Sequence, residues 1–514
     1  MNSSSKTGLI ATAVAMALGT QAAHALAPGA TINQVYYEAG GSAQENAAFA
    51  AVYTLLTPST VDIYTDQTSG ALSPNYLIVT GTTNAAGNTA LGFGSSQNIL
   101  FFYKFNGGSF PNGAFPFAYP TTDTVNSVLN YPVTSAIGSS VATANASPAT
   151  NPSSPTYKFT ATGTATDPHS PDFGLTDVEV PIFNNLYNLN ATSPLTSAQL
   201  ANIQQDGIYL DVFGVTVTNA VFAGTGDFAG HAKTNFSKQE VAAVLSGAFT
   251  NWNQMFDDNG NQMPSKPIWL LDRGSGSGTK ASGNQYFLNY PGGLAVGGNL
   301  TPRSVNSSSV NNYTNTLLDM TQNIYQDVKE ASTAAVVLDL QNANGAGHGA
   351  ISILAAEFPP ALNQVGGVSQ YSFAKIGGVA IDTANGSTDD INTSGSTKYT
   401  NVVTGAYDFA FQNSFNTRAG LIPTGTCTSV TSANAKMACA IRTALTSENI
   451  SAAHSGQALP NGVTGLLIDP VKAPAQDAGV VMWTRNKNST KPILANFDAT
   501  SVNGGHITYG SDPL

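Results

Sequence analysis

The stretch from Arg273 to Thr279, which reads Arg-Gly-Ser-Gly-Ser-Gly-Thr, is the part of the chain best suited to binding an anion. It follows an apolar run at 267–272 that is typical of a buried strand, and a helix is expected after it. A turn of this kind exposes unpaired backbone N–H groups at the positive end of the helix dipole. Arg273 adds a planar group of donors that fits two oxygens of a phosphate or carboxylate. A flexible linker would have a similar composition. The position of the segment 273–279 directly after a predicted buried strand favours an anion site instead.

The same turn contains the string Ser277-Gly-Thr-Lys280, which has the Ser-x-x-Lys form that some acyltransferases use. The companion motifs of such enzymes are missing. There is no Ser-Asp-Asn, no Gly-x-Ser-x-Gly, and the only Lys-Thr-Gly lies at 6–8. We therefore expect no enzyme activity.

The composition limits the possible partners. The chain has 514 residues, of which 10% are charged, and its formal net charge is −11. Binding to nucleic acid requires clusters of Lys and Arg, so a nucleic-acid partner is not expected. The six histidines show no metal-ligand spacing, so no metal or other cofactor is expected. The length allows two or three domains.

The N-terminus has the features of a secretory signal peptide. Lys6 is followed by an apolar run at 7–19 and by a small-residue cleavage signature that ends at Ala25. The apolar run is shorter than the ~20 residues that a membrane span needs. No cysteine lies near the cleavage point, so a lipid anchor is not expected. We predict that 1–25 is removed and that the mature protein is periplasmic or secreted, without a membrane span.

The order of predicted elements is that of an α/β protein. Residues 26–135 are expected to be rich in strands with small helices, and 138–166 to be a surface loop or insertion. A strand is predicted at 207–217. Ser237 and Glu240 form a capping-box pattern at the start of a helix. A longer helical segment is expected over 313–342, followed by strands at 350–354 and 371–376.

Two motifs in this order carry a resemblance to a known family. Residues Asp172 to Asp177 read Asp-Phe-Gly-Leu-Thr-Asp, and Arg273 to Thr279 contain Arg-x-x-Gly-Ser-Gly-Thr. The chain thereby resembles the PstS-like phosphate-binding proteins of ABC-type uptake systems, which have the type II periplasmic binding fold. The second motif matches at every specified position, and in the first Thr176 replaces a serine. The resemblance is specific over about 172–285.

This resemblance implies roles for individual residues. Arg273, Ser277, Gly278 and Thr279 would contact an oxyanion from one lobe, and Asp177 would contact it from the other. A carboxylate fits such a site only if the ligand carries a proton to donate, so Asp177 would select phosphate over sulfate. Arg273 would pair with Asp177 and hold it ionised. The alternative for Asp177 is an ordinary helix cap or turn carboxylate.

Further contacts of the first lobe are implied at two Gly-flanked turns. Ser42 and Ala43 precede a predicted helix at 46–56, and Ser109 follows a predicted strand at 99–104. The alternatives are an ordinary helix start for Ser42 and a hairpin turn for Ser109. Ala43 replaces an aromatic residue that the family has beside the first hydroxyl, so the identity of the ligand stays open.

The resemblance also implies a two-lobed α/β fold with a hinge and an enlarged first lobe. We expect the first lobe to comprise 26–205 and 380–514, and the second to comprise 206–379. The protein would be a monomeric phosphate receptor, the substrate-binding component of an ABC uptake system or a relative without a permease. The alternative is a secreted or surface interaction protein that keeps the fold without a transport role.

Cys427 and Cys439 are the only two cysteines. In an exported chain they are expected to form one local disulfide, which would contribute about 2–3 kcal/mol to stability. The alternative is two unpaired thiols.

Overall fold

The computed structural model describes most of the chain between residues 30 and 446 and three short strands after it. The residues left undescribed are 1–29, 67–74, 146, 150–154, 160–165, 185–187, 190–193, 289–317, 331, 382–399, 404–405, 424–426, 428, 447–465, 469–482, 486–491 and 495–514. The expected signal peptide, 1–25, lies outside the described residues. Within the described part, no helix is long and apolar enough to cross a membrane.

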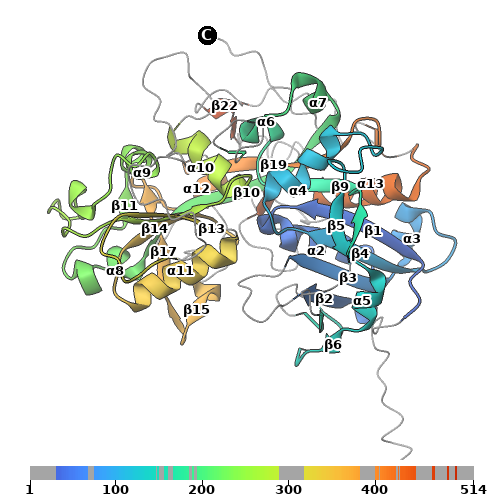
Figure 1. The fold of residues 1–514 in the computed structure, drawn as a ribbon, viewed down its shortest axis with the longest axis horizontal. Helices are drawn as coiled ribbons and strands as arrows, with labels where there is room; N and C mark the ends of the chain where they lie inside the picture. Colours follow the sequence, from blue (N-terminus) through green and yellow to red (C-terminus); the bar gives the residue numbers. More distant parts are fainter. Residues whose placement is uncertain are drawn as a thin grey trace, which may run out of the picture.

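One mixed sheet of fourteen strands runs through the whole molecule (Figure 1). Two of these strands, β10 (Ile203–Thr218) and β19 (Ala410–Arg418), lie next to each other at its middle. Strands on one side of this pair are β14 (Ala350–Ala355), β12 (Trp269–Arg273), β13 (Gln326–Glu330) and β17 (Tyr371–Phe373). Strands on the other side are β9 (Phe173–Thr176), β1 (Gln34–Gly40), β4 (Asn98–Lys104), β3 (Tyr76–Thr82), β2 (Asp62–Asp66), β7 (Tyr157–Phe159) and β6 (Val141–Ala142). β20 (Leu466–Ile468) also pairs with β10.

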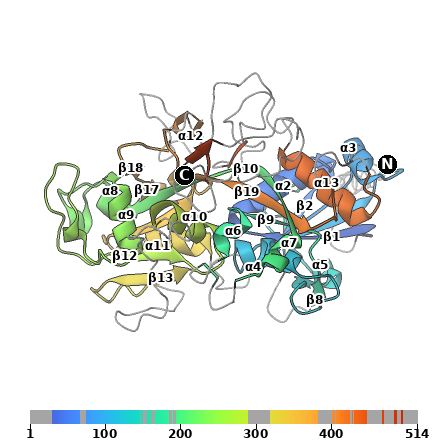
Figure 2. The ribbon, with the colours of Figure 1, turned by 90° about the horizontal axis from the view of Figure 1, so that it is seen from above.

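The strand β10 connects the two halves of the sheet. Its first part, up to Val212, pairs antiparallel with β19, and its second part, from Phe213, pairs antiparallel with β14. Figures 1 and 2 show the consequence, which is one lobe built from the N-terminal third of the chain and a second lobe built from its middle. The expected two-lobed α/β class is confirmed. The lobe boundaries remain predictions, and the first of them, between 205 and 206, falls inside β10.

Helices cover both halves of the sheet. The first lobe carries α2 (Glu45–Tyr53), α3 (Ala85–Leu91), α4 (Ser109–Gly113), α5 (Thr134–Gly138) and, from the end of the chain, α13 (Ala433–Thr446). The second lobe carries α8 (Asn219–Phe222), α9 (Lys238–Leu245), α10 (Gly278–Leu288) and α11 (Thr333–Gly345). Short helices α6 (Val180–Phe183), α7 (Ser197–Ala201) and α12 (Thr400–Val403) lie between them in sequence. Small two-stranded sheets pair β5 (Leu129–Pro132) with β8 (Thr166–His169), β11 (Asn235–Phe236) with β18 (Lys375–Ile376), β15 (Gln364–Val365) with β16 (Val368–Ser369), and β21 (Trp483–Arg485) with β22 (Pro492–Leu494).

Several predicted elements are confirmed. Helix α9 begins at the predicted capping box, in which Ser237 accepts from the backbone N–H of Glu240 and the Glu240 side chain accepts from that of Ser237. The predicted strands at 207–217, 267–272, 350–354 and 371–376 correspond to β10, β12, β14 and β17 with β18.

The helix expected over 313–342 is wrong in its first half. Residues 326–330 form the strand β13, which pairs parallel with β12 along its full length. Pairing to a buried neighbour outweighs local propensity here, because it buries Val328 and places Lys329 beside Asp272. The helix α11 starts only after Ser332, whose side chain accepts from the N–H of Ala335. The part at 313–317 lies outside the described residues.

The segment 138–166, expected to be a surface loop or insertion, is not entirely a loop. It contributes β6 and β7, and β7 extends the sheet by pairing parallel with β2. Thr156 adds a side-chain contact, because its Oγ1 accepts from the N–H of Ile63 at 3.0 Å. Polar composition did not prevent these residues from completing an otherwise open sheet edge.

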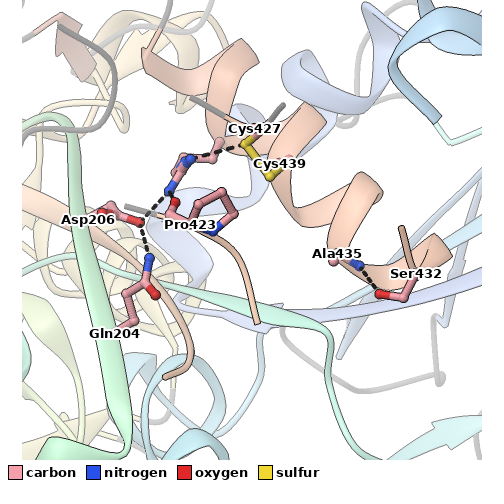
Figure 3. The surroundings of a disulfide bond; sticks show 8 residues. Gln204, Asp206, Pro423, Cys427, Ser432, Ala435 and Cys439 are labelled. Atoms are coloured by element: carbon pink, nitrogen blue, oxygen red, sulfur yellow. Dashed lines mark hydrogen bonds and ion pairs between the residues drawn. A yellow bond between two sulfur atoms is a disulfide. The ribbon is translucent and has the colours of Figure 1, made fainter. Parts of the chain in front are cut away.

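The predicted disulfide between Cys427 and Cys439 is present, with the two Cα atoms 5.8 Å apart (Figure 3). It joins the middle of α13, at Cys439, to the segment before this helix. Beside it, Arg442 of α13 pairs with the buried Asp206 of β10 at 2.9 Å and donates to the carbonyl of Pro423 at 2.9 Å. The disulfide and this ion pair together fix the returning C-terminal helix against the central strand.

Candidate functional site

The loop Arg273–Thr279 leads from β12 into α10, as predicted. Its Gly276 has a φ of +77°, a conformation that glycine adopts readily. The N–H of Phe110, in the first lobe, donates to the carbonyl of Gly276 at 2.9 Å. The loop is therefore held by contacts with the other lobe, and the interpretation of this segment as a free linker is wrong.

Asp177 follows β9 and is only 3% exposed. Its Oδ1 accepts from Nε2 of Gln44 at 3.0 Å, and its backbone N–H donates to Oγ of Ser109 at 3.0 Å. The backbone N–H of Gly278 also donates to this carboxylate. The structure thus brings the two sequence motifs together at the N-terminus of α10. Asp177 does not cap the next helix, because the N-cap of α6 is Glu179, so the helix-cap alternative is wrong. The other alternative, a turn carboxylate, is not excluded, because Asp177 lies in a bend after β9.

Burial raises the pKa of the Asp177 carboxyl above its ordinary value. The hydrogen bond from Gln44, the charge of Arg273 and the bonds to Ser109 and Gly278 lower the pKa, but they do not outweigh desolvation. One donor of Arg273 is not directed at Asp177, because Nη1 of Arg273 donates to Oγ1 of Thr333 at 2.5 Å. Arg273 lowers the pKa of Asp177, but burial has the larger effect, so the pKa is raised overall. That Arg273 holds this carboxyl ionised stays a prediction.

The three first-lobe candidates differ in their contacts. Ser109 begins α4 and accepts from Asp177, so the hairpin-turn alternative is wrong. Ser42 begins a short 3-10 helix, Ser42–Gln44, as its alternative supposed, and its Oγ also lies 3.3 Å from Oγ1 of Thr333 in the second lobe. Ala43 is 2% exposed and packs in the hydrophobic core, so it adds no polar contact to the site.

Two residues of this arrangement were missed from the sequence. Thr333 is the first residue of α11, and its Oγ1 accepts from Nη1 of Arg273 and lies within hydrogen-bond distance of Oγ of Ser42. Gln44 links Asp177 to the central strands, because its Oε1 accepts from the hydroxyl of Tyr209 and from Nδ2 of Asn413. The only sequence signal for Gln44 is its place two residues after Ser42.

Two donors at the loop have no hydrogen-bond partner among the described residues. They are Nε of Arg273 and the hydroxyl of Thr279, in residues that are 6% and 1% exposed. A buried donor without a partner carries a desolvation cost of about 1–3 kcal/mol, more if charged. Ser277, also buried, lies between them in sequence. The site can therefore offer an oxyanion two uncommitted donors beside the positive end of α10.

Lys280 is not available as a base for Ser277. Its Nζ lies 2.5 Å from Oδ2 of Asp272, which also pairs with Lys329 at 2.6 Å. Burial alone would raise the pKa of Asp272, but the two lysines hold it well below its usual range. An ammonium held in this way does not take a proton from a serine. Among the described residues, no group of His, Cys, Asp and Glu is arranged to hold a metal ion.

The comparisons with known proteins give distant structural similarity only. No protein-family model matches the sequence, and no curated protein matches it. A chain from Clostridium perfringens with bound phosphate, assigned as a phosphate ABC transporter substrate-binding protein, is 13% identical over 53% of this chain and 73% of that chain, with a TM-score of 0.29. PstS from Borrelia burgdorferi is 13% identical over 48% and 67%, with a TM-score of 0.25. A phosphate-binding protein from Stenotrophomonas maltophilia is 16% identical over 49% and 65%, with a TM-score of 0.25. Similarity at this level does not decide what this chain binds.

Proposed function

We propose that this chain is an exported binding protein for phosphate or a closely related tetrahedral oxyanion, which performs no chemistry of its own. It would serve an ABC-type uptake system or be a relative of such receptors without a permease. The observation that carries the proposal is the meeting of Asp177, from the first lobe, with the N-terminus of α10, beside two donors that lack a partner.

The chemistry of the donors and the acceptor supports a protonated oxyanion. Arg273, Thr279 and the backbone of the loop would donate to the ligand oxygens, and each charge-assisted bond contributes about 1.5–3 kcal/mol. The carboxylate of Asp177 would accept a hydrogen bond from the protonated oxygen that phosphate has and sulfate lacks at neutral pH. Ser109 supports this role, because its Oγ accepts from the backbone N–H of Asp177 and so holds the backbone that carries this side chain.

The experiment is isothermal titration of the mature chain, freed of bound anion, with phosphate. The Arg273→Ala variant should bind about ten- to a hundredfold more weakly, which corresponds to the loss of one charge-assisted bond. Lys375→Ala is the matched control, because it removes an exposed positive charge in the second lobe. Unchanged phosphate affinity in Arg273→Ala would contradict the assignment of the site.

One observation favours the second candidate, an interaction protein that keeps the fold without a transport role. Donors that would serve an anion are already used inside the protein, since Gly278 donates to Asp177 and Arg273 donates to Thr333. If the bond between Gly278 and Asp177 persists in solution, the two lobes stay joined without a ligand. Absence of binding heat with both phosphate and sulfate would favour this candidate.

A further inference from the structure

Two buried acidic side chains near the candidate site have no role in the function proposed above. Asp211 lies on β10 and is 0% exposed, and Glu357 follows β14 and is 7% exposed. None of their carboxyl oxygens has a hydrogen-bond partner among the described residues. Buried acids without partners are costly, so their presence here requires an explanation.

Strand geometry places these two acids together, next to Asp177. The N–H of Ala356 donates to the carbonyl of Val212 at 2.7 Å, which brings Glu357 beside Asp211 where β10 changes partners. Tyr209 and Asp211 lie on the same face of β10, because their pairing with β20 is regular and alternate residues share a face. The hydroxyl of Tyr209 reaches Gln44, and Gln44 donates to Asp177.

The electrostatic effects agree with this placement. Burial is the main cause that raises the pKa of Glu357 well above its ordinary value, and Asp211, Asp177 and Glu45 raise it further. Burial and Asp177 raise the pKa of Asp211 in the same way. The three carboxyl groups therefore lie within electrostatic range of one another.

This arrangement gives the site an excess of acidic groups. Arg273 is the cation that faces Asp177, while the nearby Lys280 and Lys329 are paired with Asp272. A ligand that was only an anion would gain from Arg273 and the loop but would meet the acids at its other end. A ligand with a cationic end would be attracted by both.

We propose that the site takes a small ligand with a tetrahedral oxyanion at one end and an ammonium group at the other, the ammonium being received by Asp211 and Glu357. The inference rests on the proposed oxyanion site and specifies the class of its ligand. The unpartnered hydroxyl of Thr279 and Nε of Arg273 serve the anionic end. The unpartnered carboxyl oxygens serve the cationic end with acceptors that suit the three donors of an ammonium.

Binding of the ammonium has a consequence that can be measured. Burial raises the pKa of Asp211 and of Glu357, so each carboxyl keeps its proton to a higher pH than an ordinary acid does. An ammonium placed against them favours the ionised forms, so binding should release protons. A ligand with the same two-carbon chain but without the amino group should not cause this release.

The test is isothermal titration of the mature wild-type chain at pH 7 with inorganic phosphate, phosphoethanolamine and ethyl phosphate, each in two buffers of different ionisation enthalpy. Phosphoethanolamine should bind at least about tenfold more tightly than ethyl phosphate, the equivalent of one charge-assisted bond, and should release protons. In the double variant Asp211→Asn with Glu357→Gln, the preference and the proton release should both disappear.

Glu38→Gln is the matched control, because Glu38 is another fully buried acid without partners for its carboxyl oxygens, and its pKa is raised by burial and by Asp172. This variant should keep the preference for phosphoethanolamine. Equal binding of phosphoethanolamine and ethyl phosphate, with phosphate still bound, would overturn this inference and leave the oxyanion site standing. A preference that survives in the double variant would also overturn it. Binding of none of the three ligands would overturn the proposed function itself.

Discussion

The carboxylate of Asp177 lies against the first residue of α10, and only a glycine fits there. A Cβ atom added to Gly278 would lie 2.2 Å from Oδ2 of Asp177 and 2.4 Å from its Cβ. The two residues are far apart in sequence and come from different lobes, so this contact joins the two motifs. Gly278 is therefore required for the close approach as well as for its N–H.

Replacing Gly278 with alanine should separate the two lobes at this point. The added methyl group collides with Asp177, which has little freedom because Gln44 and Ser109 hold it. We expect phosphate affinity to fall by about tenfold or more, as for the loss of one charge-assisted bond. Gly345→Ala, at the end of α11 with open space around the added atom, should leave affinity unchanged. Equal titration curves for both variants and the wild type would contradict the contact.

The choice between phosphate and sulfate should depend on the ionisation of Asp177. The ionised carboxylate accepts a hydrogen bond from the P–OH group of phosphate and repels sulfate, whereas the protonated carboxyl can donate a hydrogen bond to either anion. Because burial raises this pKa, discrimination should weaken at a higher pH than an ordinary aspartate would give. Sulfate titrations between pH 5 and 9 should show binding that appears as the pH falls.

The Asp177→Asn variant should bind sulfate across this whole range, because the amide can donate at every pH. Ser277→Ala, which leaves the carboxyl in place, should keep the pH-dependent discrimination. If sulfate binding by the wild type does not change with pH, Asp177 does not discriminate between anions by whether they carry a proton.

The sequence predicted the local parts of this site better than their connections. The turn at 273–279 and the capping box at Ser237 depend on residues that are neighbours in sequence, so both could be predicted from the sequence alone. Thr333 could not be found in this way, because its contacts with Arg273 and Ser42 depend on how the lobes meet. The strand at 326–330 was missed for a similar reason, since its partner β12 lies more than fifty residues earlier. The acids Asp211 and Glu357 have no sequence signal at all.

Asp272 should contribute strongly to stability. It pairs with two largely buried lysines, and its removal would leave Lys280 and Lys329 without this partner. Asp272→Asn should cost about 3–5 kcal/mol in the free energy of unfolding, as measured by urea denaturation at pH 7. Asp227→Asn should cost less than about 1 kcal/mol, because its pair with Lys266 is more exposed to solvent.

The interaction of Asp272 with its two lysines should also determine how stability changes at acidic pH. The pKa of Asp272 is depressed in the folded state, so its contribution is present above the unfolded value, near 4, and is lost as the pH falls below it. The wild type should therefore lose stability on acidification more steeply than Asp272→Asn. Parallel curves of unfolding midpoint against pH for the two proteins would argue against this role.

The disulfide between Cys427 and Cys439 should stabilise the first lobe without changing ligand binding. It closes a loop with a sequence separation of 12, for which chain entropy gives about 3 kcal/mol. The double variant Cys427→Ser with Cys439→Ser should unfold at lower urea concentration and bind phosphate as before. A large loss of affinity would mean that α13 has a part in the site.

The most direct test of the account is titration of the mature wild-type chain, stripped of bound anion, with phosphate and then sulfate at pH 8. The account predicts binding of phosphate in the micromolar range or tighter, from several charge-assisted bonds after the costs of association, and negligible binding of sulfate. Absence of heat with phosphate, from a protein shown to be folded and free of anion, would contradict it.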